Sequence, residues 1–463
     1  MFGNLGVILG LALLIFLALR GTNVLLASIL SASVVALAHG QSLVTALTFD
    51  YSGAMMKFAG MFLLLFLTGA MFGRVIGESK AAMSIAYALS RSLGVERTLL
   101  IGTLACALLT YGGVNVFIVV FTVYPLGLGL MVRANIPKRI FMAATMLGAG
   151  TFTMTALPGS PSIQNNIPAV ALKTSLWAAP GLGLLASLVM IILGLSYIEW
   201  ERRRAERRGE KFVPAPTDVL PEADPDPATM PHWAISLIPL AAVVGTIVVP
   251  QLVRPFLPEV PGGDVSGGDA DLGLLGTLVE FARTQPLMWT NVAMVAGTLM
   301  ALVLLRRFLP RPLSTLSRGA ESSLLPLMNT AAVIGFGGVV QATPVYDSIA
   351  HVMVDSGLPP LVSAAVSINI VSGIVGSASG GLGIFVQTLA PHYLETGVAP
   401  EVLHRVIAIG SGGLDSLPHC GAIITTFTVM GLTHREAYKD TFVVTVLIPL
   451  IALVVVLLAA QFA

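Results

Sequence analysis

The sequence predicts an all-α polytopic membrane protein made of two inverted-topology repeats. Three observations predict this class. Of the 463 residues, 55% are hydrophobic and 11% are charged; apolar segments of spanning length recur along the chain; and three motifs occur twice in the same order. Soluble domains carry about 25% charged residues, so the composition excludes a soluble protein. The formal net charge of +1 gives no basic surface, and we expect no nucleic-acid partner.

The spanning helices are predicted from length and hydropathy, because a membrane helix needs about 20 mostly apolar residues and satisfies its own backbone groups. Each repeat contains five such segments. The ten segments are residues 4–19, 23–39, 53–76, 138–170, 175–199, 233–252, 286–305, 322–341, 401–432 and 439–461. The repeats therefore cover residues 1–199 and 232–463. The charged and Pro-rich residues 200–231 between them predict a flexible cytoplasmic linker.

Two segments do not fit a single span. Residues 98–131 and 359–391 are each too long for one crossing and are interrupted by glycine. This pattern predicts re-entrant hairpins made of two half-helices. Short, weakly apolar pieces at 80–93 and 345–356 precede the hairpins, and we expect both pieces to lie at the membrane interface.

The distribution of basic residues predicts the orientation, because Lys and Arg concentrate on cytoplasmic connections. If both termini face outward, 20 of the 25 Lys and Arg residues lie on the inner side. The basic run at 202–211 is then expected near anionic membrane lipid. The first 20 residues lack a basic leading region and a cleavage site, so we expect them to stay in the mature protein. Cys106 and Cys420 lie in apolar stretches, where we expect small core residues and no disulfide.

An internal duplication is indicated by three matches. FGRV at 72–75 with SIA at 84–86 matches FGGV at 336–339 with SIA at 348–350. GGVNVF at 112–117 matches GGLGIF at 380–385, and Leu157-Pro158 matches Leu417-Pro418. The offsets are 264, 268 and 260 residues. Because each half has five full spans, the second copy enters the membrane from the opposite face, which predicts inverted repeats.

The hairpin tips are the first candidate binding elements. They comprise residues 110–115 and 376–381, and each contains a Gly-Gly pair beside Asn or Ser. Glycine allows close backbone approach, and half-helix N-termini present free N–H groups that suit a carboxylate. The alternative is that the small residues only let helices pack closely.

The broken helices are the second candidate elements. Residues 155–166 pack Pro158 and Pro161 among polar side chains, so the helix is expected to unwind there. Residues 410–421 hold Asp415 and His419, an ionisable pair inside an apolar segment. Such a pair is costly in a bilayer unless it is paired or hydrated, which points to a functional role. A purely structural Asp–His hydrogen bond is the alternative.

Enzymatic and nucleotide-driven functions lack a motif. There is no His-Glu-x-x-His zinc motif, phosphate-binding loop or nucleophile elbow in the sequence. We therefore expect no enzyme and no cofactor. A channel stays open as an alternative, although inverted halves with a midplane site favour alternating access.

At its broken segments the sequence resembles the gluconate permease family of the ion transporter superfamily. The resemblance rests on YGGVNVF at 111–117, LPGSP at 157–161 and GGLDSLPH at 412–419, and the last segment is closer to 3-hydroxybutyrate permease-like members. Cys420 departs from the asparagine expected in those relatives. The resemblance implies cation-coupled uptake, usually with protons, of a small hydroxy-carboxylate across a bacterial inner membrane. It also implies an elevator arrangement, with a transport domain from 97–170 and 359–432 and a scaffold that often dimerises.

These observations together predict a symporter for one hydroxy-monocarboxylate, with sodium coupling or an anion uniporter or channel as alternatives. Asp415 and His419 are the predicted ion-coupling residues, and hard cations such as Na⁺ would also accept oxygen ligands. Substrate contacts are expected from Tyr111, Gly112, Gly113, Asn115, Ser160, Gln164, Asn165, Ser377, Ser379, Gly380, Gly381 and Ser416.

Overall fold

The computed structural model describes residues 2–20, 22–216, 218, 220, 226–253, 256, 273–343, 357–418 and 420–461. Within these ranges the chain forms helices and no strands. His419, the piece at 345–356, the second SIA motif and residues 257–272 lie outside the described residues.

The first half, through the end of α11, contains a long helix, a hairpin and a broken helix in the predicted order. Its elements are α1 (Phe2–Leu19), α2 (Val24–Ala38), α3 (Leu43–Thr45), η1 (Ala46–Tyr51), α4 (Ser52–Glu78), α5 (Ala81–Leu93), η2 (Val95–Arg97), α6 (Thr98–Tyr111), α7 (Val116–Ala134), α8 (Lys138–Gly150), α9 (Phe152–Thr155), α10 (Ile163–Ala171) and α11 (Pro180–Arg207). The predicted hairpin is α6 and α7, and the predicted broken helix is α8, α9 and α10.

The second half follows the same order. Its elements are η3 (Pro227–Thr229), α12 (Trp233–Val253), α13 (Gly273–Thr284), α14 (Pro286–Leu304), η5 (Arg306–Phe308), α15 (Pro312–Gln341), α17 (Pro360–Val375), α18 (Ala378–Thr388), α19 (Ala390–Glu395), α20 (Pro400–Ser411), α21 (Gly421–Met430), α22 (His434–Phe442), η6 (Val443–Leu447) and α23 (Ile448–Ala459). Helix α13 was not predicted, because its glycine-rich start hides a short amphipathic pattern.

Six helices in the described ranges are long and apolar enough to cross a membrane, or seven if the bent pair of α5 and η2–α6 counts as one span. The predicted ten spans are not all of that length. Helix α2 has only 15 residues, and the spans at 138–170 and 401–432 are divided by unwound segments. The structure is that of an all-helical, polytopic membrane protein.

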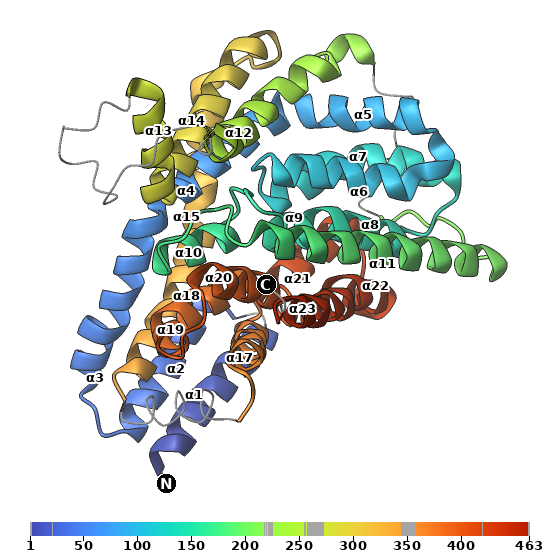
Figure 1. The fold of residues 1–463 in the computed structure, drawn as a ribbon. Helices are drawn as coiled ribbons and strands as arrows, with labels where there is room; N and C mark the ends of the chain where they lie inside the picture. Colours follow the sequence, from blue (N-terminus) through green and yellow to red (C-terminus); the bar gives the residue numbers. More distant parts are fainter. Residues whose placement is uncertain are drawn as a thin grey trace.

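Packing separates the helices into two groups. Helix α15 runs along α4, α2 and α14 pack on this pair, and α1 and α12 pack in turn on α2 and α14. On the other side α11 packs against α23 and α8, and α20 packs against α17 and α10. Figure 1 shows α4 and α15 crossing the left of the view while α6, α7, α8 and α11 stack on the right.

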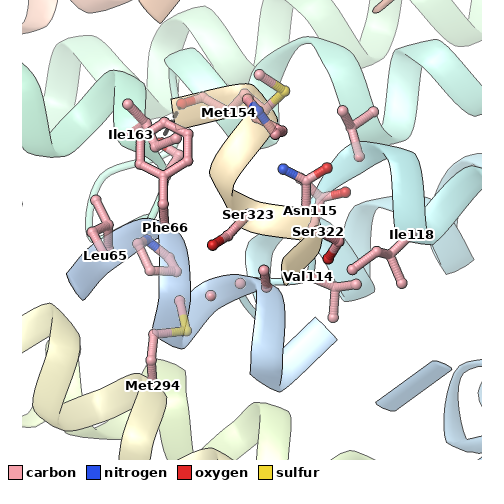
Figure 2. Close-up of a pocket in the computed structure, with 18 of the residues that line it drawn as sticks. Leu65, Phe66, Val114, Asn115, Ile118, Met154, Ile163, Met294, Ser322 and Ser323 are labelled. Atoms are coloured by element: carbon pink, nitrogen blue, oxygen red, sulfur yellow. Dashed lines mark hydrogen bonds between the residues drawn. The ribbon is translucent and has the colours of Figure 1, made fainter. Parts of the chain in front are cut away.

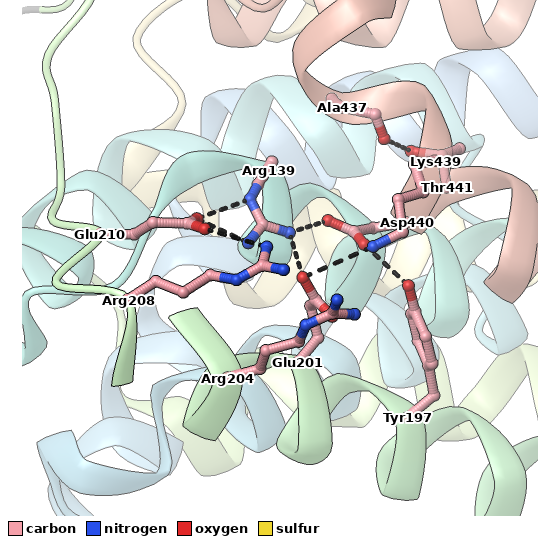
Figure 3. Close-up of polar contacts among 10 residues, drawn as sticks. All are labelled: Arg139, Tyr197, Glu201, Arg204, Arg208, Glu210, Ala437, Lys439, Asp440 and Thr441. Carbon is pink, nitrogen blue, oxygen red and sulfur yellow. Dashed lines mark hydrogen bonds and ion pairs between the residues drawn. The ribbon is translucent and has the colours of Figure 1, made fainter. Parts of the chain in front are cut away.

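A buried ionic cluster fixes the start of α8 (Figure 3). The Arg139 guanidinium contacts the carboxylates of Glu201 on α11, Glu210 and Asp440 on α22. Glu201 and Asp440 have side chains only 1% and 2% exposed, and the Tyr197 hydroxyl donates to Asp440 over 2.7 Å. Buried charges need such partners, so these contacts tie α8, α11 and α22 together.

The first part of the predicted linker makes contacts with the helices beside it. Helix α11 continues through Arg207, well past the predicted span end at residue 199. Beyond it, Glu210 binds Arg139, and Asp218 binds the buried Lys138 ammonium over 2.7 Å. These residues form a strap across the start of α8, and we call residues 208–216 together with Asp218 the strap below.

Candidate functional site

A cavity of about 280 Å³ lies between α4, the α6–α7 tip, the start of α10, and α15 (Figure 2). Its apolar lining includes Leu65, Phe66 and Ile163, on the left of the view. The polar residues that line it are Arg74, Thr110, Asn115, Ser162, Gln164, Ser322 and Ser323. Arg74 is the single charged residue among the described lining residues.

Two half-helices begin at this cavity. Helix α7 starts directly after Asn115, and α10 starts directly after Ser162, whose backbone is extended. Both flanking residues and the first residues of both helices line the cavity. The N–H groups of a first helical turn have no acceptor within their own helix and carry a partial positive charge. The cavity therefore receives two positive helix ends.

The tip glycines serve this geometry in different ways. Gly113 has a φ of +95°, a conformation that favours glycine, and it lines the cavity. Gly112 ends α6 and packs so closely on Leu240 that an added methyl group would lie 2.5 Å from its Cδ2. The nearby Thr110 hydroxyl is buried and has no hydrogen-bond partner in the described part of the chain. An unsatisfied buried hydroxyl at a cavity wall indicates room for a polar ligand.

Arg74 is held in place by α4 and α15. Its Nε donates to Glu78 Oε1 over 2.7 Å, and the Glu78 carboxylate also receives Arg318 Nη2 over 2.7 Å and the Thr315 hydroxyl over 2.6 Å. The side chain of Arg74 is 39% exposed. It therefore has an oriented guanidinium with donors left for a ligand.

Several predicted site residues do not line the cavity. They hold the backbone that lies behind its lining. Ser160 is fully buried and donates to the Thr153 carbonyl over 2.9 Å. Asn165 donates to the carbonyls of Ser160 and Leu176, both over 2.9 Å, and Tyr111 donates to the Pro158 carbonyl over 2.9 Å. These bonds satisfy backbone groups that the unwound segment leaves without helical partners.

The second tip and the second unwound segment contact each other. The Asp415 carboxylate accepts hydrogen bonds from the Ala378 N–H at the start of α18 and from the Ser416 hydroxyl, the latter over 2.9 Å. The Ser377 hydroxyl caps α18 by accepting from the Gly380 N–H over 3.3 Å, and it lies 3.3 Å from the Ser379 hydroxyl. The group that occupies this helix end is thus a carboxyl side chain of the protein itself.

No protein-family model matches the chain. A relative from Bacillus subtilis (strain 168), the uncharacterized transporter YxjC, is 38% identical over 462 residues and is covered over 95% of both chains. The chain belongs to this family of transporters. An uncharacterized transporter from Haemophilus influenzae is 23% identical over 377 residues, which cover 81% of this chain and 78% of the relative.

The fold also has a solved counterpart. The crystal structure of the Alcanivorax borkumensis YdaH transporter, described as having an unusual topology, superposes with a TM-score of 0.54. The match covers 91% of this chain and 89% of that one, at 15% identity. At that identity the likeness supports the fold and not the cargo. Together with the long apolar helices, the relatives identify a multi-pass membrane transporter.

Of the predicted substrate contacts, Gly113, Asn115 and Gln164 line the cavity of this transporter. The remaining predicted residues lie around it or at the second tip: Tyr111, Gly112, Ser160, Asn165, Ser377, Ser379, Gly380, Gly381, Ser416 and Asp415. His419 lies outside the described residues.

Sequence reasoning did not name five of the polar lining residues as substrate contacts. Thr110 and Ser162 lie within the predicted tip and the predicted broken helix, whereas Arg74, Ser322 and Ser323 lie outside both candidate elements. Arg74 falls within the duplicated FGRV motif, and that position is the one signal for it in the sequence. The two serines of α15 carry no motif. Their presence at the site follows from the packing of α15 along α4.

Proposed function

We propose that this transporter is a secondary active symporter for a small hydroxy-carboxylate of the 3-hydroxybutyrate or gluconate type. The observation that carries the proposal is a cavity into which two helix N-termini open and whose one charged described lining residue is Arg74. A carboxylate fits this arrangement, because helix N-termini and a guanidinium fork both bind anions. The serine, threonine and glutamine groups around it suit substrate hydroxyls.

The size of the cavity supports a small cargo. Pockets for drug-sized ligands enclose roughly 300–1,000 Å³, and about 280 Å³ lies just below that range. The apolar side formed by Leu65, Phe66 and Ile163 suits the carbon chain of a short acid. A 3-hydroxybutyrate-like substrate with one apolar end fits this mixed lining better than a fully hydroxylated sugar acid.

We further propose an elevator mechanism with inverted repeats. Two similar contacts support it: a methyl group at Gly73 would lie 2.8 Å from Ile118 Cδ1, and one at Gly337 would lie 3.2 Å from Ile384 Cγ1. In both halves a long helix thus receives the second arm of a hairpin on a glycine. The moving body comprises α6–α11 and α17–α23, with α11 and α23 included because they pack on each other and on α20. The scaffold comprises α1–α4 and α12–α15.

Asp415 is the proposed coupling residue, together with His419, which follows it by four residues in the sequence. Its carboxylate lies against the N-terminus of α18, where a bound cation and the helix end compete for the same charge. Coupling to protons is the first choice, and coupling to sodium is the second. Asp415→Asn is expected to abolish accumulation while exchange survives, because symport requires ion and substrate to favour the same state.

The deciding experiment is uptake of labelled 3-hydroxybutyrate and gluconate into proteoliposomes, with proton and sodium gradients imposed separately. Accumulation of one acid under one gradient supports symport and identifies the driving ion. Equilibration without accumulation under both gradients supports the alternative, an anion uniporter or channel. Absence of flux for both acids contradicts the proposed substrate class.

The membrane context belongs to the same proposal. The distribution of basic residues supports a bacterial inner-membrane protein with both termini outside and residues 200–231 on the cytoplasmic side. The scaffold is proposed to form a homodimer, as the resemblance to gluconate permeases implies. Labelling of a cysteine placed in the strap from either side of the membrane tests the orientation.

A further inference from the structure

The fully buried guanidinium of Arg405 on α20 is the feature that the proposed function does not use. Its Nε and Nη2 donate to the Ala178 carbonyl over 3.0 and 2.8 Å, and Nη1 donates to the Ala156 carbonyl over 3.3 Å. A further bond of 3.4 Å reaches the Leu176 carbonyl. No carboxylate of the described residues forms an ion pair with it. A buried cation that is bound only by carbonyls keeps its charge uncompensated.

The neighbouring His404 is buried as well and contacts the same region. Its Nε2 lies 3.0 Å from Asn165 Oδ1, and its Nδ1 lies 2.6 Å from the Thr174 hydroxyl. An amide oxygen only accepts, so Nε2 carries a proton and donates it to Asn165 Oδ1, while the Thr174 hydroxyl is the hydrogen-bond partner of Nδ1. Asn165 in turn holds the Ser160 carbonyl. The two side chains thus hold residues 156–178 at both ends.

These contacts cross between the two halves of the chain. Residues 156–162 and 172–179 leave carbonyls without helical donors, and at membrane depth there is no water to replace them. Helix α20 supplies the donors to the Ala156 and Ala178 carbonyls, and it ends at Ser411, directly before the second unwound segment. A methyl group at Gly412 would lie 2.9 Å from Thr155 Cγ2. Helix α20 therefore contacts the first unwound segment through His404 and Arg405, and its C-terminal end leads directly into the second unwound segment.

The position of the contacts relates them to the cavity. Met154, Pro161 and Ser162 line it and flank the held carbonyl of Ala156. The fit around the guanidinium is tight, since a methyl group at Gly183 would lie 2.5 Å from that carbonyl oxygen and 3.2 Å from Arg405 Nε. A loss of these bonds would release the wall that presents the α10 N-terminus to the cavity.

We propose that Arg405, assisted by His404, is a positioning residue that fixes the first unwound segment and adds a fixed positive charge behind the anion site. This inference rests on the proposed function for its anion-binding part. Its structural part, the clamp on residues 156–178, stands without it. This role explains why a buried charge is retained in the interior of a membrane protein, where it would otherwise be destabilising.

Two substitutions separate the clamp from the charge. Arg405→Gln removes both, whereas Arg405→Lys keeps the charge and loses the planar fork that serves several carbonyls at once. Arg203→Gln is the control, because Arg203 is 66% exposed and forms a surface ion pair with Glu199. Hydrogen exchange of the purified protein reports the clamp independently of any substrate, and uptake kinetics report the charge.

Both Arg405 variants are expected to exchange about tenfold faster than wild type in residues 155–179, as the loss of one or two hydrogen bonds implies. Arg405→Gln should also raise the half-saturation concentration about tenfold, and Arg405→Lys should restore part of that loss. If neither variant folds, Thr174→Val, which removes only the hydroxyl bonded to His404, must still speed exchange in this segment. Exchange equal to wild type in the variants that fold overturns the clamp.

The kinetic arm separates this inference from the proposed function. If the wild-type protein transports neither acid, the substrate proposal fails while the exchange measurement still decides the clamp. If the wild type transports and Arg405→Gln alters only the maximal rate, with Arg405→Lys indistinguishable from it, the charge role is wrong. Arg203→Gln should match wild type in both measurements.

Discussion

Arg74 makes the sharpest prediction at the scale of single residues. Arg74→Gln is expected to raise the half-saturation concentration for the acid at least about tenfold, because a hydrogen bond to a charged group contributes about 1.5–3 kcal/mol. The fold should survive, since Glu78 keeps its contacts to Arg318 and Thr315. Initial uptake rates in proteoliposomes measure the effect.

The matched control is Arg318→Gln. Arg318 contacts the same Glu78 carboxylate but does not line the cavity. Uptake by this variant should equal that of wild type, because an exposed ion pair contributes little. Equal losses in both variants would show that the Glu78 ion-pair network matters and that Arg74 does not contact the substrate.

Gly113 gives a second prediction. Gly113→Ala forces a side chain into a φ of +95°, a strain of about 1–3 kcal/mol, and it moves the tip that presents the α7 N-terminus. Uptake should fall severalfold. Gly181→Ala is the control, because an added methyl group there meets no atom within 4 Å and alanine favours a helix. Equal uptake by both variants would contradict the role of the tip.

Single residues also mark the limit of sequence reasoning. The sequence singles out Ser160, Asn165 and Gln164 as polar groups in a broken helix, and only Gln164 lines the cavity. Ser160 and Asn165 turn inward to satisfy carbonyls. Which polar group faces a ligand depends on the backbone path of the unwound segment, and helical periodicity ends where that segment begins.

At the scale of elements, the strap links charge to the position of α8. Burial alone would raise the pKa of Asp218, but hydrogen bonds from Lys138 and Tyr124 hold that pKa below its usual range. The side chains of Lys138 and Asp218 are 4% and 1% exposed. Removing one partner of such a pair leaves a buried charge unpaired.

Asp218→Asn is therefore expected to destabilise the protein by about 3 kcal/mol, seen as a lower unfolding midpoint in detergent. The lowered pKa means that Asp218 stabilises the fold above its unfolded pKa of about 3.9 and loses this effect as the pH falls further. The difference in unfolding midpoint between wild type and variant should thus become smaller below about pH 4. Glu206→Gln, at a carboxylate 72% exposed, should leave the midpoint unchanged, and an equal drop there would contradict the strap.

Elements were the most predictable level of this protein. The hairpins at 98–131 and 359–391 and the unwound segments after them occur where glycine and proline interrupt apolar runs. The strap was not predicted, because its order comes from ion pairs to Lys138 and Arg139 that lie about 70–80 residues away in sequence. Arg405 lies 227 and 249 residues away in sequence from the Ala178 and Ala156 carbonyls that it binds. No local sequence pattern predicts such a contact.

At the scale of the whole molecule, helix packing divides the protein along the faces of α4 and α15. The cavity lies on this boundary, since its lining comes from α4, α14 and α15 on one side and from α6, α7 and α10 on the other. A site between two bodies changes its access when one body slides against the other. The division therefore makes movement across the boundary a requirement of the proposed mechanism.

A pair of adjacent residues on α15 tests that requirement. Gly337 faces Ile384 of α18, where an added methyl group would lie 3.2 Å from Ile384 Cγ1, and Gly338 faces Ala54 of α4, at 2.6 Å from its Cβ. Cysteines at 337 and 384 link scaffold to moving body, whereas cysteines at 338 and 54 link two scaffold helices. Both pairs are placed in a chain whose buried, free Cys106 and Cys420 are replaced by alanine.

Oxidation of the first pair is expected to stop uptake, and reduction should restore it, because the cross-link holds the two bodies in one position while leaving the cavity untouched. Neither Gly337 nor Ile384 lines that cavity. Oxidation of the second pair should leave uptake unchanged, since it joins helices that move together. Full uptake by completely cross-linked 337–384 protein would mean that α15 and α18 do not separate during transport, and an elevator movement across this boundary would then be wrong.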